Sequence, residues 1–357
     1  MSGDKIRIWW LEIEKATSYE ISQKRHQGTE DYQLVKTVEG CPKSEEEGIC
    51  ETEVYIEDRL TGYDFKFQAQ FNKPQIRILV FGTHLSIYLN GDYRAEWYYP
   101  EKQDENQMID SVVVPREASS AVYFKGEVYI IGGKDLLTER RPKTVLALDP
   151  KAYGLRNVSE LKESRSYHSS AVWNGAIYTC GNGDQGTTCE RYRSDNWEYI
   201  EDLVYPAATL VVFQNVLYAV GGWRVVAIDE STAVMKYSVE KNTWKEGIAP
   251  MQYKRRNPVA AESNGKLFVC GGALAISTTP TCEQYDPAEN KWSNISSLNG
   301  DHYGAKMFSY GDGLLIVDSC QGPDKPGVEV YDREKDNWTA APGLKKRRCS
   351  PNAVIVP

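Results

Sequence analysis

The chain repeats itself, and this self-similarity restricts its fold more than any other feature of the sequence. Five segments align without gaps, each with a hydrophobic or aromatic residue 13 positions after its start and a glycine pair, or its degraded form, three positions later. These segments begin at Arg116, Arg165, Tyr205, Arg255 and His302. Residues at recurring positions are therefore expected to share one structural role.

A tyrosine and a tryptophan mark the second half of the repeat. Three of these pairs are seven residues apart: Tyr237 and Trp244, Tyr285 and Trp292, Tyr331 and Trp338. The tryptophans at 197, 244, 292 and 338 recur with a period of 46 to 48 residues, and Trp97 lies 100 residues before Trp197. The copy between them lacks its tryptophan, near residues 153–155. The period therefore predicts six repeats.

A repeat of this length suits a small four-stranded sheet. Such a sheet cannot bury both faces alone, so copies are expected to stack radially around an axis. The glycines allow strands to approach closely, and the tyrosine and tryptophan rings fill the space between neighbouring sheets. The segments YDPAENKW and YDREKDNW have the composition of tight turns. The sequence thus predicts an all-β, six-bladed propeller over residues 73–357.

The Gly-Gly, Tyr and Trp pattern resembles the kelch repeat family. By this resemblance the first blade is IRILVFGTHLSIYLNGDYRAEWYYP, which lacks its leading strand. The segment RRCSPNAVIVP supplies one strand and nothing more, with Ala353 and Val354 in the places of Ala121 and Val122. We expect this C-terminal strand to close the ring against the first blade, because closure removes exposed sheet edges.

Residues 1–72 form a separate β-patterned segment. Five stretches alternate with the period of a strand, and their order resembles a fibronectin type III domain. In that resemblance Trp9 or Trp10 is the core tryptophan and Tyr63 belongs to the tyrosine corner. The resemblance implies a small β-sandwich; the alternative is a β extension packed on the propeller.

The eight cysteines contain no CxxC pair, which gives metal binding no support. The first residues lack the pattern of a signal peptide, and no apolar run is long enough to span a membrane. We therefore expect a cytoplasmic protein with free thiols, away from any membrane. Cys41 and Cys50 bracket a polar loop and are the one candidate pair.

Charge and histidine content restrict the function further. Residues 1–72 carry 9 basic against 15 acidic residues, whereas the remainder of the chain is nearly neutral. A general nucleic-acid binder would carry a basic excess, so we expect no nucleic acid partner. The four histidines are dispersed, and no nucleophile elbow or phosphate loop is present. We expect no enzyme activity, no catalytic residues, no metal and no cofactor.

Recognition residues of propellers gather on the loops at one end of the channel. We predict a partner-binding face made of loops between blades and loops after the glycine pairs. Its predicted contact residues are Arg140, Arg141, Tyr167, His168, Trp223, Arg224, Lys254, Arg256, Asn257, Arg348 and Ser350. Its arginines would favour an acidic or phosphorylated partner segment. The alternative, preferred for Arg116 and Arg165, is that an arginine at the repeat start is structural.

The kelch resemblance implies a protein-interaction module. The first interpretation is the substrate-recognition propeller of a BTB-kelch adaptor of cullin-RING ubiquitin ligases. Because 72 β-patterned residues cannot hold the helical BTB and BACK domains, this chain would be a fragment or a stand-alone propeller. The second interpretation is an actin-associated or scaffolding kelch protein, and the third is an enzyme that uses the channel mouth.

Overall fold

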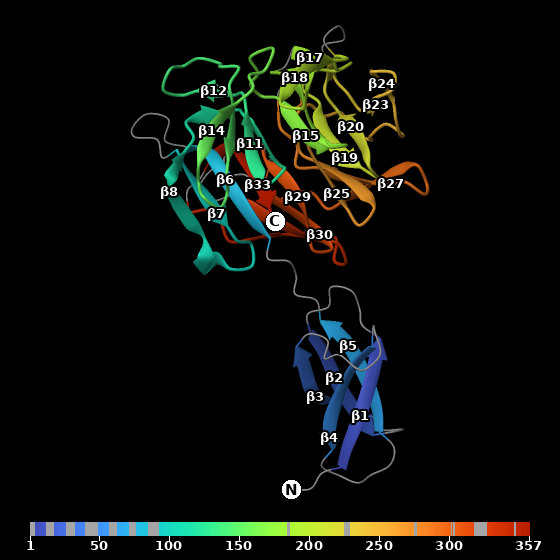
Figure 1. Ribbon diagram of the computed structural model, residues 1–357. Helices are drawn as coiled ribbons and strands as arrows, with labels where there is room; N and C mark the ends of the chain where they lie inside the picture. The colour runs from blue at the N-terminus through green and yellow to red at the C-terminus, as the bar shows by residue number, and fades with distance from the viewer. Residues whose placement is uncertain are drawn as a thin grey trace. The chain divides into compact units, whose positions relative to one another are not determined.

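The computed structural model divides into two compact units, Met1–Gln75 and Ile76–Pro357. In the first unit it describes the backbone of five strands. In the second it describes residues 76–84, 93–183, 186–224, 229–274, 277–300, 302, 304–317, 327–345 and 348–357. Figure 1 traces both units.

The N-terminal unit is built from antiparallel strands. Its five strands are β1 (Asp4–Leu11), β2 (Ser18–Arg25), β3 (Gln33–Glu39), β4 (Ile49–Ile56) and β5 (Tyr63–Gln70). β1 pairs with β4, and β2 lies between β3 and β5. The side chains of Trp9, Trp10 and Tyr63, on which the fibronectin type III prediction depends, lie outside the described residues, as does Cys41.

The second unit is a six-bladed β-propeller, as the repeat predicts. It contains six antiparallel sheets of four strands each (Figure 1). From the innermost strand outward, blade 1 contains β33 (Arg348–Val356), β6 (Arg77–His84), β7 (Arg94–Tyr98) and β8 (Gln107–Val113). Blade 2 contains β10 (Ser120–Phe124), β11 (Glu127–Ile131), β13 (Val145–Leu148) and β14 (Leu155–Val158). Blade 3 contains β15 (Ser169–Trp173), β16 (Ala176–Asn182), β17 (Gly186–Arg193) and β18 (Asn196–Ile200).

The remaining three blades repeat this order. Blade 4 contains β19 (Thr209–Phe213), β20 (Val216–Val220), β23 (Val234–Ser238) and β24 (Thr243–Glu246). Blade 5 contains β25 (Val259–Ser263), β26 (Lys266–Cys270), β27 (Cys282–Asp286) and β28 (Lys291–Ile295). Blade 6 contains β29 (Lys306–Tyr310), β30 (Gly313–Val317), β31 (Val328–Asp332) and β32 (Asn337–Ala340).

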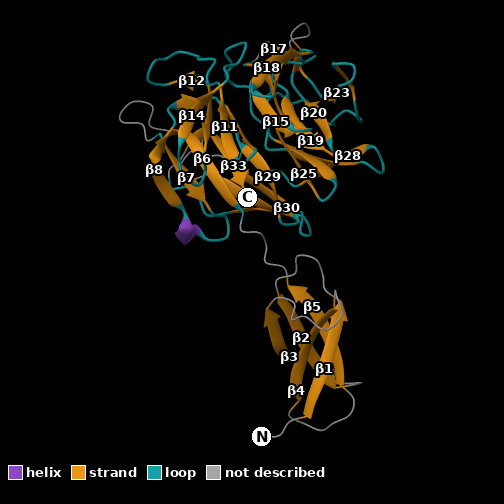
Figure 2. Cartoon of the chain, in the orientation of Figure 1, coloured by secondary structure: helices purple, strands orange, loops and turns teal. Residues whose placement is uncertain are grey.

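Strands account for nearly all regular structure in the described residues (Figure 2). Two short ladders lie beside the blades: β9 (Arg116–Glu117) with β12 (Lys134–Asp135), and β21 (Trp223–Arg224) with β22 (Asp229–Glu230). The one helical turn in the described ranges is η1 (Gln103–Glu105). None of the described helical structure has the length and apolar character of a membrane span.

The C-terminal strand closes the ring. β33 pairs with β6 of blade 1, with Ala353 opposite Val80 and Val354 opposite Leu79. The innermost strands of the six blades neighbour one another in the cyclic order β33, β10, β15, β19, β25, β29 and back to β33. The predicted closing strand is therefore confirmed.

Tight hairpins join the two inner strands of blades 2 to 5. In each hairpin both turn residues have positive φ, the conformation of the two-residue turn whose twist matches the strands it joins. Asn174-Gly175 and Asn264-Gly265 have the preferred asparagine-glycine sequence, with φ of 47° and 69°, and of 48° and 71°. These turns fix the register of the inner strands.

The tryptophans stabilise the contact between blades, as predicted. The indole of Trp292 in blade 5 is buried, and its Nε1 donates to the carbonyl of Ala249, which follows the outer strand of blade 4, at 2.7 Å. Trp197, Trp244 and Trp338 make the same bond to the preceding blade. Blade 2 lacks the tryptophan, and there the hydroxyl of Tyr153 accepts a hydrogen bond from Trp97 of blade 1 at 3.1 Å.

The prediction of free thiols is wrong for four of the cysteines, because two disulfides lie within blades. Cys180 bonds Cys189 and joins β16 to β17; Cys270 bonds Cys282 and joins β26 to β27. In both pairs the two residues stand directly opposite each other on neighbouring antiparallel strands, which brings their Cα atoms to 4.2 and 4.1 Å. Such bridges are rarer in reduced compartments than in oxidising ones, and the cytoplasmic location stays a prediction.

Candidate partner-binding face

The backbone has the same unusual conformation at the start of five blades. Two residues before the innermost strand the chain passes through the left-handed region, with φ between 47° and 75°. The residues are Ala118, Tyr167, Ala207, Asn257 and Gly304. Non-glycine residues in this region carry strain, and such residues concentrate at functional sites. Blades 2 to 6 therefore each present one sharply turned loop at the same end of the propeller.

The glycine pairs hold these loops together. A Cβ atom on Gly132 would lie 2.5 Å from the carbonyl oxygen of Arg165, and one on Gly221 would lie 2.5 Å from that of Arg255. Only glycine allows so close an approach. This close approach allows a hydrogen bond from the second glycine of each pair. The backbone N–H groups of Gly133 and Gly222 donate to the same two carbonyls, at 2.6 and 2.8 Å. Each glycine pair thus anchors the start of the next blade.

The arginines at the blade starts are buried and structural. Arg165 donates to Glu190 of the same blade and to the carbonyl of Gly181, at 2.9 and 3.0 Å. Arg255 does the same with Glu283 and with the carbonyl of Gly271, at 3.2 and 2.8 Å. Arg116 lies in the same setting and donates to the carbonyl of Gly132 at 2.9 Å. This confirms the structural interpretation of Arg116 and Arg165.

Arg348 belongs to the same group, in contrast to its predicted place at the surface. Its side chain is fully buried and lies 3.9 Å from the Glu96 carboxylate. The guanidinium also donates to the carbonyl of Arg94 at 2.7 Å. A partner cannot reach this side chain while the ring is closed. In blade 6 a buried His302 and Glu329 take the place of the arginine and glutamate.

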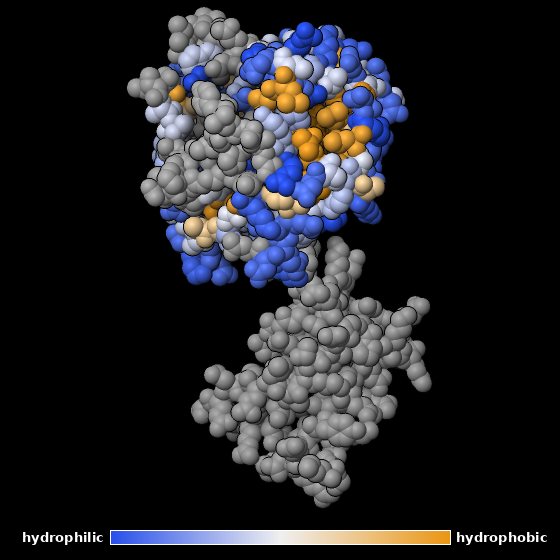
Figure 3. All heavy atoms as spheres, turned by 90° about the vertical axis from the view of Figure 1, so that its left-hand side faces the viewer, coloured by the Kyte–Doolittle hydropathy of each residue, from blue (hydrophilic) through white to orange (hydrophobic). Residues whose placement is uncertain are grey.

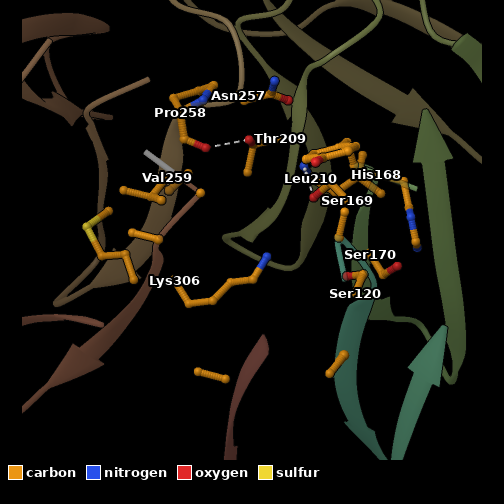
Figure 4. Close-up of a pocket in the computed structure, with 18 of the residues that line it drawn as sticks. Ser120, His168, Ser169, Ser170, Thr209, Leu210, Asn257, Pro258, Val259 and Lys306 are labelled. Atoms are coloured by element: carbon orange, nitrogen blue, oxygen red, sulfur yellow. Dashed lines mark hydrogen bonds between the residues drawn. The ribbon is translucent and has the colours of Figure 1, made fainter. Parts of the chain in front are cut away.

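The blade-start loops surround a pocket at the mouth of the axial channel (Figure 4). Its cavity volume is about 230 Å³, and all six blades line it. The lining consists of the loop residues just described and the first residues of the innermost strands, with Ala353 contributed by β33. The face predicted from the repeat therefore contains a cavity.

Three predicted contact residues line this pocket: Tyr167, His168 and Asn257. Tyr167 is 45% exposed, so its ring is available to a partner. His168 is buried, and neither of its ring nitrogens has a hydrogen-bond partner among the described residues. Burial, together with the charges of Arg165 and Lys306, lowers the pKa of His168 to about 3. Its imidazole is therefore neutral near pH 7.

A second group of predicted residues lies around blades 4 and 5. The Arg256 guanidinium stacks on the ring of Trp223, 5.3 Å from its centroid. Lys254 is exposed and forms an ion pair with Asp229. The amide of Trp223 donates to the carbonyl of Pro206 at 2.8 Å, which joins this group to the start of blade 4. These residues form an aromatic and basic rim.

The remaining predicted residues are spread more widely. Arg140 and Arg141 are exposed in the long connection that follows β12. The side chains of Arg224 and Ser350 lie outside the described residues. The structure therefore groups Tyr167, His168 and Asn257 at the pocket and Trp223, Lys254 and Arg256 near blades 4 and 5.

Lys306 is a pocket residue that the sequence analysis missed. It is the first residue of β29, and the corresponding first strand residues of blades 2 to 5 are Ser120, Ser169, Thr209 and Val259. All of these are small, polar or β-branched, so the lysine departs from the repeat. Burial lowers the pKa of Lys306. This departure, visible in the aligned segments, is the signal that would have found it.

Comparison with known proteins identifies the family of two of the repeats. A model of the Kelch motif matches residues 206–247 and 254–299, which contain the strands of blades 4 and 5. These are kelch repeats. The Kelch-like protein 23 of Homo sapiens is 29% identical over 235 residues, which is 60% of this chain and 40% of that protein. Alpha-scruin of Limulus polyphemus is 23% identical over 71% of this chain and 31% of its own length.

A viral protein and a solved structure are also similar to this chain. The Kelch repeat and BTB domain-containing protein 1 of Cowpox virus is 22% identical over 77% of this chain and 49% of its own length. The chain thus spans less than half the length of each of these relatives. A solved structure described as "Structure of YjhT" matches the fold with a TM-score of 0.56, at 16% identity, over 68% of this chain and 90% of that one. That match supports the propeller fold alone.

Proposed function

We propose that the kelch propeller is a protein-recognition module and that a partner binds on the face around the axial pocket. The observation that carries this proposal is the convergence of five left-handed blade-start loops on one cavity. Rigid strands hold these loops, and recognition by a propeller depends on such loops. The fold alone does not determine function, which depends on the residues of this face.

The chemistry of the face favours an acidic segment of the partner. The exposed ring of Tyr167 offers an anchor of the kind that dominates many interfaces. Arg256 and Lys254 place positive charge at the rim, although Asp229 pairs with the latter. We propose binding rather than catalysis, because among the described lining residues no serine or threonine hydroxyl is hydrogen-bonded to His168 as its base.

Within this proposal, the finer role is substrate recognition for a cullin-RING ubiquitin ligase. It is supported by the similarity to Kelch-like protein 23 and to a kelch repeat and BTB domain-containing protein. The similarity to Alpha-scruin supports the alternative, an actin-associated or scaffolding role. Co-purification of a cullin with the full chain would favour the first role, and co-sedimentation with filamentous actin would favour the second.

The binding face itself is tested by proximity labelling of the full chain in cells, with two tyrosine variants. Tyr167→Ala removes the exposed ring at the pocket, and Tyr199→Ala removes a ring that is 54% exposed on the outer strand β18. We expect the protein partners captured by the wild type to be lost from Tyr167→Ala and kept by Tyr199→Ala. If both variants keep every partner, the proposed face is wrong.

A further inference from the structure

The axial pocket has an unbalanced charge. Among its described lining residues Lys306 is the one charged side chain, and the lining contains no aspartate or glutamate. Figure 4 shows Lys306 extending from one wall into the pocket, with Ser120, Ser170 and His168 on the opposite side. A half-buried cation without a nearby acid is costly, because its charge loses water and gains no partner.

No group among the described residues offsets this cost. The Lys306 ammonium has no hydrogen bond or ion pair to any of them, and no carboxylate opposes the effect of burial on it. His168 across the pocket is buried and neutral, so it supplies no negative charge either. The arrangement is what a pocket needs when the counter-ion comes from a ligand.

Three serine hydroxyls of the wall keep a hydrogen to donate, whereas Ser170 and Thr209 already donate to Thr179 and to the carbonyl of Pro258. The Ser169 hydroxyl oxygen already accepts a hydrogen bond from the amide of Leu210 at 2.9 Å, and that of Ser119 accepts one from Asn352 at 2.5 Å. Each hydroxyl therefore keeps its own hydrogen for another acceptor. The Ser120 hydroxyl has no hydrogen-bond partner among the described residues. These three hydroxyls and the Lys306 ammonium thus line one pocket as donors, which suits an anion.

We propose that the axial pocket is a carboxylate site, in which Lys306 is the counter-ion and the hydroxyls of Ser119, Ser120 and Ser169 donate hydrogen bonds. The carboxylate comes from an aspartate or glutamate side chain of the bound partner, which enters the channel mouth past Tyr167. This proposal rests on the proposed function, because it names the anchor of the protein partner. A cavity of about 230 Å³ has room for such a side chain.

The test uses the full chain with its lysines carrying ¹³C-methyl groups, which keep their charge. The Lys306 signal is assigned by its absence from Lys306→Arg, and two capped peptides, Gly-Glu-Gly and Gly-Gln-Gly, serve as probes. We expect the glutamate peptide to shift the Lys306 signal and to raise the pKa of this ammonium, because a carboxylate favours its charged form. The glutamine peptide should leave the signal unchanged.

A matched pair of variants measures the contribution of the charge. Lys306→Met removes the ammonium from the pocket, and Lys291→Met removes the same charge from an exposed site on the outer strand β28. We expect Lys306→Met to weaken binding of the glutamate peptide roughly tenfold or more, the usual effect of losing a hydrogen bond to a charged group. Lys291→Met should bind as the wild type does. A thermal melt of each variant confirms folding, and an unbranched methionine is well suited to the pocket wall.

The outcomes separate the two proposals. If the glutamate and glutamine peptides shift the Lys306 signal equally, or neither shifts it, the carboxylate site is wrong. If free succinate binds more tightly than the glutamate peptide, the carboxylate comes from a small molecule and the partner-anchor proposal is wrong. If Tyr167→Ala loses its cellular partners while Lys306→Met keeps them, the proposed function stands and the pocket proposal fails.

Discussion

Arg165 and Arg255 each join three parts of one blade: the loop that starts it, the glycine pair and the third strand. The ion pairs with Glu190 and Glu283 are fully buried. A buried ion pair stabilises a fold little compared with apolar packing, because both charges lose their hydration. Its effect is instead geometric, since the guanidinium also holds the carbonyl of the glycine pair. The arginine therefore fixes the loop that forms the binding face.

This role predicts a large and specific loss of stability. Arg165→Met leaves the Glu190 carboxylate buried without its counter-charge, so we expect the free energy of unfolding to fall by about 3–5 kcal/mol. Arg191→Met is the control, because Arg191 pairs with a half-exposed Glu198 in the same blade, and such pairs contribute about 1 kcal/mol or less. Urea denaturation measures both. Equal losses in the two variants would contradict the structural role.

Sequence reasoning reached some of these residues and not others, for a physical reason. The repeat assigns a place along the blade, so it correctly predicted the packing of Trp292 and the position of Tyr167 on the loop face. The repeat does not show whether a loop residue is buried, because burial depends on residues distant in the sequence, such as Glu96 beside Arg348. Lys306 was missed because the contact residues were predicted on the loops alone, and Lys306 is the first residue of a strand. Only the closed ring shows that this position faces the channel.

Individual blades differ in how their strands are held together. Blades 3 and 5 each have a disulfide between their second and third strands, and in both the first cysteine directly precedes the first glycine of the pair or its remnant. These bridges were missed from the sequence because spacings of 9 and 12 residues give no register. Register depends on the connection between the strands, which the repeat does not fix.

The bridges predict a redox-dependent stability. Mass spectrometry of the unreduced, alkylated chain should show peptides that link Cys180 to Cys189 and Cys270 to Cys282. Loops of this length predict that each bridge adds on the order of 2–3 kcal/mol, mainly by restricting the unfolded chain. A reducing agent should therefore lower the urea midpoint of the wild type. It should have a smaller effect on a Cys180→Ser/Cys189→Ser variant. Alkylation of all four cysteines without reduction would contradict the pairing.

The ring as a whole depends on one strand. β33 supplies the innermost position of blade 1 and contacts blades 2 and 6, so it joins three of the six blades. The surface turned to the viewer in Figure 3 is mostly hydrophilic, with a smaller apolar area among the described residues. The apolar side chains of β33 belong to the interior instead, since Ala353 and Val354 are buried.

A charge in this strand should destabilise the whole propeller. Val354→Asp places a carboxylate in the apolar cluster of blade 1, where Val354 is 7% exposed, and we expect it to lower the free energy of unfolding by about 3 kcal/mol or more. Val239→Asp is the control, because Val239 is 36% exposed and its change should cost little. Urea denaturation followed by limited proteolysis distinguishes the variants. A Val354→Asp propeller as resistant as the control would show that β33 is dispensable.

The closing strand also determines when the ring can form during synthesis. Arg77, at the start of β6, donates to the carbonyl of Pro357, although 280 residues of synthesis separate them. Blades 2 to 6 can fold as they emerge, whereas β6 waits with an unpaired edge until β33 is made. Ala353 lines the axial pocket, so the pocket is complete only after this last strand arrives. A nascent chain is therefore unable to engage a ligand through this pocket before its translation reaches the final strand.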